Sequence, residues 1–368
     1  MRERRRKSVT VSGVRLWLSI HRKAILIGIF VLLFIAVAQM LLPKRPQVPP
    51  ALEFSPAIIS QIKAIQAQIS LPKEAPILTF VTTIGPIDIL DEKAVSRNHF
   101  TFHSWERLFP RVQFIVISDV SESIEFIRKH HPKVMTAFVK KHTIDFHTYR
   151  FFFQLAHDLA HPQSFAVGFT NADIAYNESL IDTVKLFGHK DQIIRKEFTF
   201  TYCSKPTHLA MVGIRNNHEP DEAFYLKMSK FLSENREQAF QRSWKHAWNA
   251  SERFGDWSQD YFVVSKDAWK VIGLTQDLYA IGGIAADNIF TYQFIHDSQF
   301  LTIDGTPSIS ALHVNHGEIR NSHQTTASVL NTQIMNYRKQ KFAFTSACQF
   351  EALSSKESVR VRRRSFWC

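Results

Sequence analysis

Apolar and polar positions follow two different patterns from about residue 75 onward. Short apolar runs rich in β-branched residues and phenylalanine predict strands at 76–85, 112–119 and 164–169. Longer segments whose apolar residues recur at helical spacing predict helices at 91–109, 121–130 and 147–161. We expect the helix at 121–130 to begin with a capping box made by Asp119 and Glu122. Because strands and helices alternate, the sequence predicts an α/β fold with a mostly parallel sheet flanked by helices.

The segment before this region has the pattern of a membrane anchor. Residues 24–42 contain no charged side chain and would span about 28 Å as a helix, enough for a bilayer core. Eight Lys/Arg precede this segment within residues 1–23, so the positive-inside rule predicts a type II orientation with a lumenal body. The alternative is a signal peptide cleaved near Ala36-Val37-Ala38. We prefer the uncleaved anchor, because the apolar run is longer than a usual signal core.

Two further segments connect the anchor to the body. Residues 43–50 are rich in proline and predict a stiff extended spacer, and the isoleucines of 57–69 have helical spacing. We therefore divide the chain into a cytoplasmic basic tail (1–23), a transmembrane signal anchor (24–42), a stem (43–74), a globular domain (75–350) and a basic C-terminal tail (351–368).

The net charge of +12 is concentrated at the two ends of the chain. Subtracting the charged ends leaves about −1 on residues 46–354, so charge does not predict a nucleic-acid groove in the body. The alternative is that the arginine-rich ends bind nucleic acid or an anionic membrane. We expect no nucleic-acid partner and a solvated C-terminal tail.

The three cysteines form no CxxC pair, which excludes zinc-ribbon and thioredoxin-like classes. Cys203 and Cys348 either pair in an oxidising lumen or remain free thiols together with Cys368. The triplets that begin at Asn177 and Asn249 are N-glycosylation sequons, which are compatible with a glycoprotein.

The candidate chemistry lies where the predicted strands end. The apolar run at 164–169 leads into Asn171-Ala172-Asp173, and ligands of parallel sheets bind at the carboxyl ends of the strands. A carboxylate there suits Mg²⁺ or Mn²⁺, which bridge oxygen ligands to substrate phosphates. Asn171 and Asp173 would share one face if the strand continued that far. The alternative is that one of them caps a helix that begins near residue 177. Later candidates are Asp287, before a predicted helix, and His313 and His316, after a short strand.

Taken in order, several segments resemble those of GT-A type glycosyltransferases, and more narrowly of nucleotide-diphospho-sugar transferase-like proteins. The similar segments are ILTFVTTIGP (77–86), SRNHFTFHSWERLFPRVQFIVISD (96–119), FTNADI (169–174), QDYFVVS (259–265), GGIAADN (282–288) and IDGTPSISALHVNH (303–316). Two positions depart from the family pattern: the usual pair of carboxylates is reduced to Asn171-Ala172-Asp173, and Ala286 stands where a bulky aromatic residue is expected.

The resemblance implies roles for particular residues. Asp173 would hold a metal ion and the diphosphate with Asn171 beside it, and His313 or His316 would be a late metal ligand or a donor contact. Asp287 would be the catalytic base. The residues implied in the nucleotide pocket are Thr82, Thr83, Arg97 and Asp119.

The resemblance also implies a function. We expect a Golgi or ER glycosyltransferase that uses Mn²⁺ or Mg²⁺ to move a sugar from a nucleotide-sugar donor, a UDP-sugar by preference, to a glycan, protein or lipid acceptor. The alternative is a non-catalytic protein of the same fold that binds a sugar nucleotide or a partner.

Overall fold

The computed structural model describes a large part of the chain after residue 55. The described residues are 56–70, 72–139, 148–197, 205–231, 235–268, 271, 281, 285–316, 328, 329, 331–333, 341, 343–355 and 358–364. Among their helices, none combines the length and apolar character that a membrane crossing requires. The predicted tail, anchor and spacer at 1–50 lie outside the described residues, as do Cys203 and Cys368. Cys348 is buried and is a free thiol, which agrees with the alternative of unpaired cysteines.

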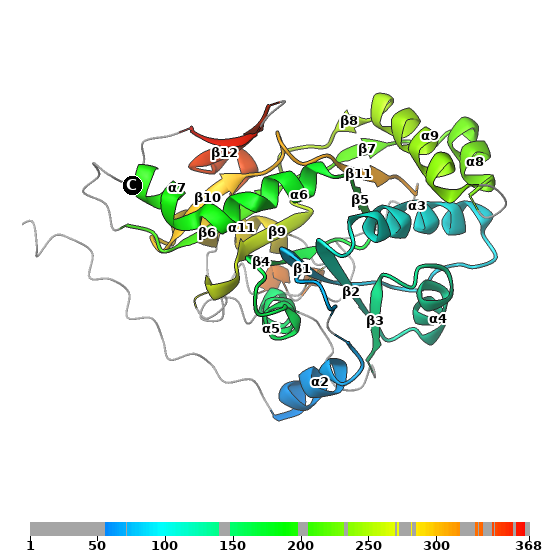
Figure 1. Cartoon of the computed structure of the whole chain (residues 1–368), viewed down its shortest axis with the longest axis horizontal. Coiled ribbons are helices and arrows are strands. Elements are labelled where there is room, and N and C mark those ends of the chain that lie inside the picture. Colours follow the sequence, from blue (N-terminus) through cyan, green and yellow to red (C-terminus); the bar gives the residue numbers. More distant parts are fainter. Residues whose placement is uncertain are drawn as a thin grey trace, which may run out of the picture. The chain divides into compact units, whose positions relative to one another are not determined.

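A large sheet forms the centre of the described structure (Figure 1). Its strand order is β13-β12-β10-β6-β9-β4-β1-β2-β3, and all strands run the same way except β9 and β13. The predicted mostly parallel sheet is therefore confirmed. The strands are β1 (Leu78–Thr83), β2 (Val112–Ser118), β3 (Met135–Phe138), β4 (Ala166–Thr170), β6 (His208–Gly213), β9 (Tyr261–Ser265), β10 (Phe300–Asp304), β12 (Phe350–Ser354) and β13 (Val359–Arg363).

A second, smaller sheet has the order β5-β11-β7-β8. Strand β11 is antiparallel to β5 and parallel to β7, and β8 is antiparallel to β7. The strands are β5 (Ile174–Tyr176), β7 (Asn216–His218), β8 (Glu252–Arg253) and β11 (Ala311–Val314). These strands come from four separate parts of the chain, so this sheet brings distant side chains together.

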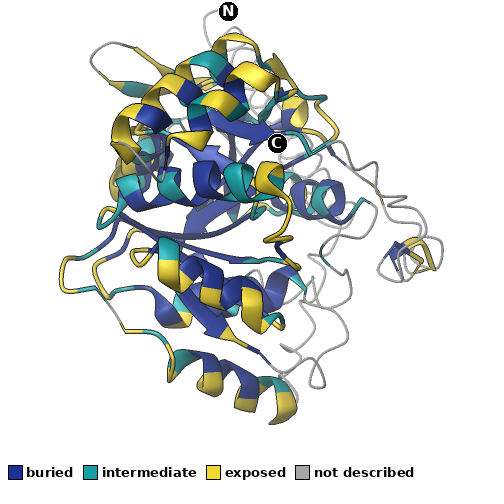
Figure 2. Cartoon of the chain, turned by 90° about the vertical axis from the view of Figure 1, so that its right-hand side faces the viewer, coloured by how far each residue is buried: buried dark blue, intermediate teal, exposed yellow. Residues whose placement is uncertain are grey.

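Helices cover both faces of the large sheet, and Figure 2 shows their inner sides buried and their outer sides exposed. In β1, Leu78 and Phe80 join one apolar cluster, whereas Val81 joins the cluster on the opposite face, as the alternation along a strand requires. The first cluster includes residues of α3 (Glu92–Leu108), α4 (Ser121–His130), α6 (Ser179–Val184) and α7 (Lys190–Glu197). The second includes residues of α2 (Pro56–Gln66), α5 (Tyr149–Leu159) and α11 (Ala286–His296). Helices α8 (Glu222–Ser229) and α9 (Arg236–Asn249) pack with residues of the small sheet in a third cluster.

The helix predicted in the stem, α2, belongs to the packed structure. Ile62 and Ile65 are buried in the same cluster as α5. The isoleucine spacing therefore predicted a helix correctly, and the partner of its apolar face is the core of the domain.

The capping box predicted for α4 is wrong. The residue that precedes the first turn of α4 is Val120, and it makes no side-chain cap. Glu122 bonds instead to the neighbouring Ser121 hydroxyl.

The expected basic C-terminal tail is also corrected, because Phe350–Ser354 and Val359–Arg363 form the strands β12 and β13 of the large sheet, with β13 at its edge. Arg364 forms ion pairs of 2.8 Å with the buried carboxylate of Asp304 and with Glu351, and Arg362 also pairs with Glu351. These arginines are thus partners of carboxylates within the fold rather than a solvated cluster.

Candidate functional site

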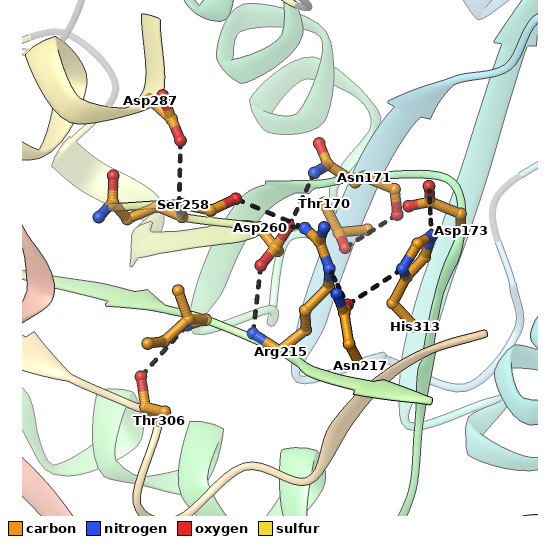
Figure 3. A network of polar contacts seen from close by, with 12 residues as sticks. Thr170, Asn171, Asp173, Arg215, Asn217, Ser258, Asp260, Asp287, Thr306 and His313 are labelled. Atoms are coloured by element: carbon orange, nitrogen blue, oxygen red, sulfur yellow. Dashed lines mark hydrogen bonds and ion pairs between the residues drawn. The ribbon is translucent and has the colours of Figure 1, made fainter. Parts of the chain in front are cut away.

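Strand β4 ends at Thr170, and Asn171, Ala172 and Asp173 form the turn into β5. The strand therefore does not continue far enough for Asn171 and Asp173 to share one of its faces. The Asn171 side chain donates a hydrogen bond of 3.1 Å to Oδ1 of Asp260, while Asp173 turns toward His313 (Figure 3). The cap alternative for Asp173 is also excluded, because β5 separates it from α6.

Asp173, His313 and His316 come together, and their ligand atoms all lie within 4.8 Å of one another. Oδ2 of Asp173 is 3.2 Å from Nε2 of His313 and 3.9 Å from Nε2 of His316. His313 is a buried residue within β11 rather than after it, and His316 follows the end of that strand. The Asp173 side chain is 49% exposed, so this group is open to solvent on one side.

The hydrogen bonds behind His313 determine which of its nitrogens carries a proton. Nε of Arg215, which can only donate, lies 2.8 Å from Oδ1 of Asn217. Nδ1 of His313 lies 3.1 Å from the same oxygen and must therefore be the N–H donor of that ring. Nε2, which faces Asp173, is left with either a lone pair or a second proton.

A lone pair on Nε2 pointing at a carboxylate oxygen 3.2 Å away is repulsive unless a positive charge lies between the two atoms. Nε2 is buried, and the carboxylate of Asp173 is the group that it faces. The geometry thus admits two states of this pair: an imidazolium–carboxylate ion pair, or two ligands of one cation. Neighbouring ligands of an octahedral ion at 2.0–2.1 Å lie about 3 Å apart, close to the observed spacing of Asp173 and His313.

The donor set also indicates which cation would fit. One carboxylate and two imidazoles favour a first-row transition ion over Mg²⁺, since Mg²⁺ prefers oxygen ligands and imidazole binds transition metals. Asn217 orients the His313 ring in the way that outer hydrogen-bond partners orient metal-binding histidines.

A buried ion pair connects this group to the large sheet. The carboxylate of Asp260 is fully buried at the start of β9 and pairs with the guanidinium of Arg215. It also accepts hydrogen bonds from the backbone N–H of Arg215 and from Asn171. The resulting chain of contacts runs from Asn171 through Asp260, Arg215, Asn217 and His313 to Asp173 (Figure 3).

The charges of this network shift its carboxyl groups in opposite directions. Burial opposes ionisation of Asp173, but His313, Arg215 and His316 outweigh it and hold the pKa of Asp173 well below its ordinary value. Burial raises the pKa of Asp260 even though Arg215 opposes the shift, and the charge of Asp173 raises it further. Asp173 is therefore ionised at neutral pH, and its carboxylate, which is partly exposed, is available to a cation.

Asp173, His313 and His316 together are called the metal-type group below. A cavity of about 220 Å³ opens beside this group. Asp173 and His316 line this cavity. Arg97 of α3, the helix that follows β1, lines it as well. Arg97 is 3.8 Å from Asp91 and donates to the hydroxyl of Tyr225 at 3.0 Å. The lining residues are Pro86, Ile87, Asp88, Asp91, Ala94, Arg97, Asn98, Thr101, Asp173, Val314 and His316.

The remaining predicted nucleotide contacts do not line this cavity. Thr82 is buried within β1, and its predicted contact with a nucleotide stays a prediction. Thr83 ends β1 and Asp119 follows β2, so both lie at the expected ends of parallel strands, and their roles stay predictions.

Asp287 lies in the first turn of α11, where Oδ2 accepts a hydrogen bond of 3.0 Å from the backbone N–H of Gln259. Burial, reinforced by the charge of Asp260, raises the pKa of Asp287 to about 6. It lies beyond Asp260 from the metal-type group (Figure 3) and does not line the cavity. A carboxyl with this pKa suits a general base at neutral pH, and the predicted role of Asp287 remains a prediction.

Sequence reasoning missed Arg215, Asn217 and Asp260. Asp260 could have been found, because it directly precedes the apolar run of β9 just as Asp173 follows that of β4. Asn217 lies in a short polar strand without an apolar pattern and Arg215 directly precedes that strand, so only the fold reveals them.

No family model and no curated protein matches the sequence. The structure is similar to 4-diphosphocytidyl-2C-methyl-D-erythritol synthase from Anaerococcus prevotii, with a TM-score of 0.31 and 10% identity over 71% of this chain and 96% of that chain. It is also similar to a mannosyltransferase from Pyrobaculum calidifontis, solved with GDP-Man and Mn²⁺, with a TM-score of 0.36 and 13% identity over 73% of this chain and 66% of that chain. A third similar structure is mannose-1-phosphate geranyltransferase from Thermus thermophilus, with a TM-score of 0.24 and 8% identity over 78% of this chain and 95% of that chain. Identities of 8–13% and TM-scores of 0.24–0.36 assign neither a family nor an activity to this chain.

Proposed function

We propose that this protein is a metal-dependent glycosyltransferase that moves a sugar from a nucleotide-sugar donor, a UDP-sugar by preference, to a glycan, protein or lipid acceptor. The observation that supports this best is the pairing of Asp173 with Nε2 of His313. That nitrogen is directed at the carboxylate by Asn217, at the edge of a cavity lined by Arg97.

Each residue of the site has a part in the proposed reaction. Asp173, His313 and His316 would hold Mn²⁺, and the bound ion would supply the positive charge that stabilises a departing nucleoside diphosphate. Arg97 adds a fixed positive charge in the wall of the same cavity, where it can bind a phosphate. Asp287, whose pKa is raised to about 6, would take the proton from the acceptor hydroxyl.

We further propose that the protein acts in the Golgi or ER as a single-pass type II membrane protein with a lumenal body. The uncharged segment at 24–42 and the basic residues before it support this placement. Protease protection of the body in intact microsomes is the expected result, and digestion of the body from the cytoplasmic side would contradict it.

A non-catalytic protein that binds a sugar nucleotide is the second candidate. It is favoured by the single carboxylate in Asn171-Ala172-Asp173, since Asn171 is bonded to Asp260 and does not join the metal-type group. Such a protein would bind the nucleotide with Mn²⁺ without breaking the sugar–phosphate bond.

The test is turnover of a panel of UDP- and GDP-sugars by the full-length protein in detergent, with Mn²⁺ or with EDTA. We expect release of a nucleoside diphosphate from one donor with Mn²⁺ only, and a loss of at least about 100-fold in Asp173→Ala. Asp182→Ala is the matched control, because Asp182 is an exposed carboxylate that pairs only with Lys185 among the described residues. Binding of a nucleotide without release from any donor would favour the second candidate.

A further inference from the structure

A second cluster of side chains that can bind a metal ion lies on the face of the small sheet opposite to that of Asn217 and His313. Asn217 and His218 are adjacent in β7, so their side chains point to opposite faces of the sheet. Asn217 bonds to His313, whereas the His218 ring lies 5.5 Å from the ring of Phe224 in α8 and 5.7 Å from that of His246 in α9.

His218 is only 1% exposed, yet neither of its ring nitrogens has a hydrogen-bond partner within the described residues. Leaving a buried polar group unpaired is costly, and native structures usually satisfy such a group with a partner, a water or an ion. The surroundings of His218 supply two further metal-type donors rather than an ordinary hydrogen-bond partner.

Those donors are Asp221 and His246. Nε2 of His246 lies 2.9 Å and 3.0 Å from the two carboxylate oxygens of Asp221. Asp221 is held in place because Oδ1 also accepts the backbone N–H of Phe224 at the start of α8. One ligand atom from each of His218, Asp221 and His246 lies within 4.8 Å of the other two.

We propose that His218, Asp221 and His246 form a second metal site, separate from that of Asp173, for a transition ion such as Zn²⁺. Two imidazoles and one carboxylate at this spacing are a usual donor set for zinc. Ligands of a tetrahedral zinc at 2.0–2.1 Å lie about 3.4 Å apart, so small side-chain rotations would close the site. The ion would join β7 to α8 and α9.

The ion has a route to the site, since Asp221 is 53% exposed and His246 lines a hollow of about 420 Å³. Lys227, Arg242 and Lys245 line the same hollow. The carboxylate of Asp221 and an anion or hydroxide in the open fourth position would offset the charge of the ion among these cations.

The experiment titrates the metal-stripped full-length protein, in detergent, with Zn²⁺ alone. It uses the His313→Ala background, which removes a ligand of the Asp173 group, so that the result does not depend on the proposed transferase activity. We expect one Zn²⁺ per chain and a rise in Tm on binding.

In the same background, His246→Ala and Asp221→Asn should each weaken Zn²⁺ binding by at least about 100-fold. Asp221→Asn keeps an acceptor at the start of α8 and removes only the charge, so it separates loss of the metal site from loss of the fold. His157→Ala is the matched control, because His157 is partly exposed and lies 3.2 Å from the carboxylate of Asp158. No Zn²⁺ bound in the background protein, or unchanged affinity in both site variants, would overturn the proposal.

Discussion

Nδ1 of His313 lies 3.1 Å from Oδ1 of Asn217, and this contact determines how the ring faces Asp173. Arg215 donates to the same oxygen, which makes it an acceptor for the histidine. The contact is made across neighbouring strands, since His313 of β11 is directly opposite Asn217 of β7. The backbone register of a short sheet therefore orients a candidate metal ligand.

The first prediction concerns this contact. Asn217→Ala should weaken Mn²⁺ binding by about 10- to 100-fold, because the ring of His313 loses the acceptor that fixes its orientation. Calorimetric titration of the full-length protein measures the effect. Asn216→Ala is the control, since Asn216 occupies the preceding position of β7 and its side chain donates a hydrogen bond to Ser251. Equal Mn²⁺ affinity in Asn217→Ala and wild type would show that the contact has no role in metal binding.

Asp287→Asn should increase the free energy of unfolding at neutral pH. It also removes the carboxylate that is proposed as the general base. Burial raises the pKa of Asp287 to about 6, so ionisation there costs folding free energy. Relative to the variant, the wild type should lose about 1 to 3 kcal/mol as pH rises from about 4 through about 6.

Urea unfolding of Asp287→Asn and wild type at pH 4 and pH 8 measures this difference. The variant should be more stable at pH 8 and nearly equal at pH 4. A less stable variant at pH 8 would mean that the ionised carboxylate is favourable where it lies.

A buried group of contacting side chains, Glu106, His131 and His99, should make the free energy of unfolding depend on pH in the opposite direction. Nδ1 of His131 lies 3.0 Å from Glu106, and Nε2 of His131 lies 2.9 Å from Nδ1 of His99. Burial opposes ionisation of Glu106, but the contacts with His103 and His131 outweigh it and lower the pKa of Glu106 to about 2. Burial lowers the pKa of His99 to about 3, so this ring is neutral at neutral pH.

Glu106→Gln should therefore reduce the free energy of unfolding at pH 7 by about 2 to 3 kcal/mol. The stability that the ionised Glu106 contributes is present above pH 4.5 and is lost as pH falls toward 2. Denaturant unfolding at pH 7 and pH 3 measures the difference, which should be largest at pH 7. An equal effect at both pH values would point to packing rather than charge.

Arg364→Ala should destabilise the fold by about 3 to 5 kcal/mol, because it leaves the buried carboxylate of Asp304 without its ion-pair partner. Thermal or urea unfolding measures the loss. The control is Arg360→Ala, which removes an exposed arginine of the same edge strand and should change stability by less than about 0.5 kcal/mol. Equal stability of Arg364→Ala and wild type would mean that residues after β12 contribute little to the fold.

The sequence predicted β1, β2 and β4 of the large sheet, because these strands are short apolar runs between helices with regular apolar spacing, and it missed the short strand β3. It also predicted that Asp173 follows a buried strand. The edge strand β13 was wrongly predicted to be part of a solvated tail, although Val359-Arg360-Val361-Arg362 alternates with the period of a strand. An arginine-rich segment is also typical of a solvated tail, so charge and alternation favoured different structures here.

The supporting residues of the site could not be predicted in the same way. Strand β7 is the polar triplet Asn216-Asn217-His218, which has no apolar pattern to mark it as a strand. Its partner β11 lies almost a hundred residues later, so the contact between Asn217 and His313 depends on a pairing that local patterns do not specify. The two faces of this strand hold both candidate metal groups.

The most direct measurement of the central claim is pulsed EPR of Mn²⁺ bound to the full-length protein, in a His246→Ala/His316→Ala background so that neither the second site nor His316 contributes a nitrogen coupling. We predict a nitrogen coupling from a bound imidazole, lost when His313→Ala is added, and Mn²⁺ affinity reduced by at least about 100-fold when Asp173→Ala is added. A nitrogen coupling that persists without His313, or unchanged Mn²⁺ affinity without Asp173, would contradict the claim that these two residues hold the ion together.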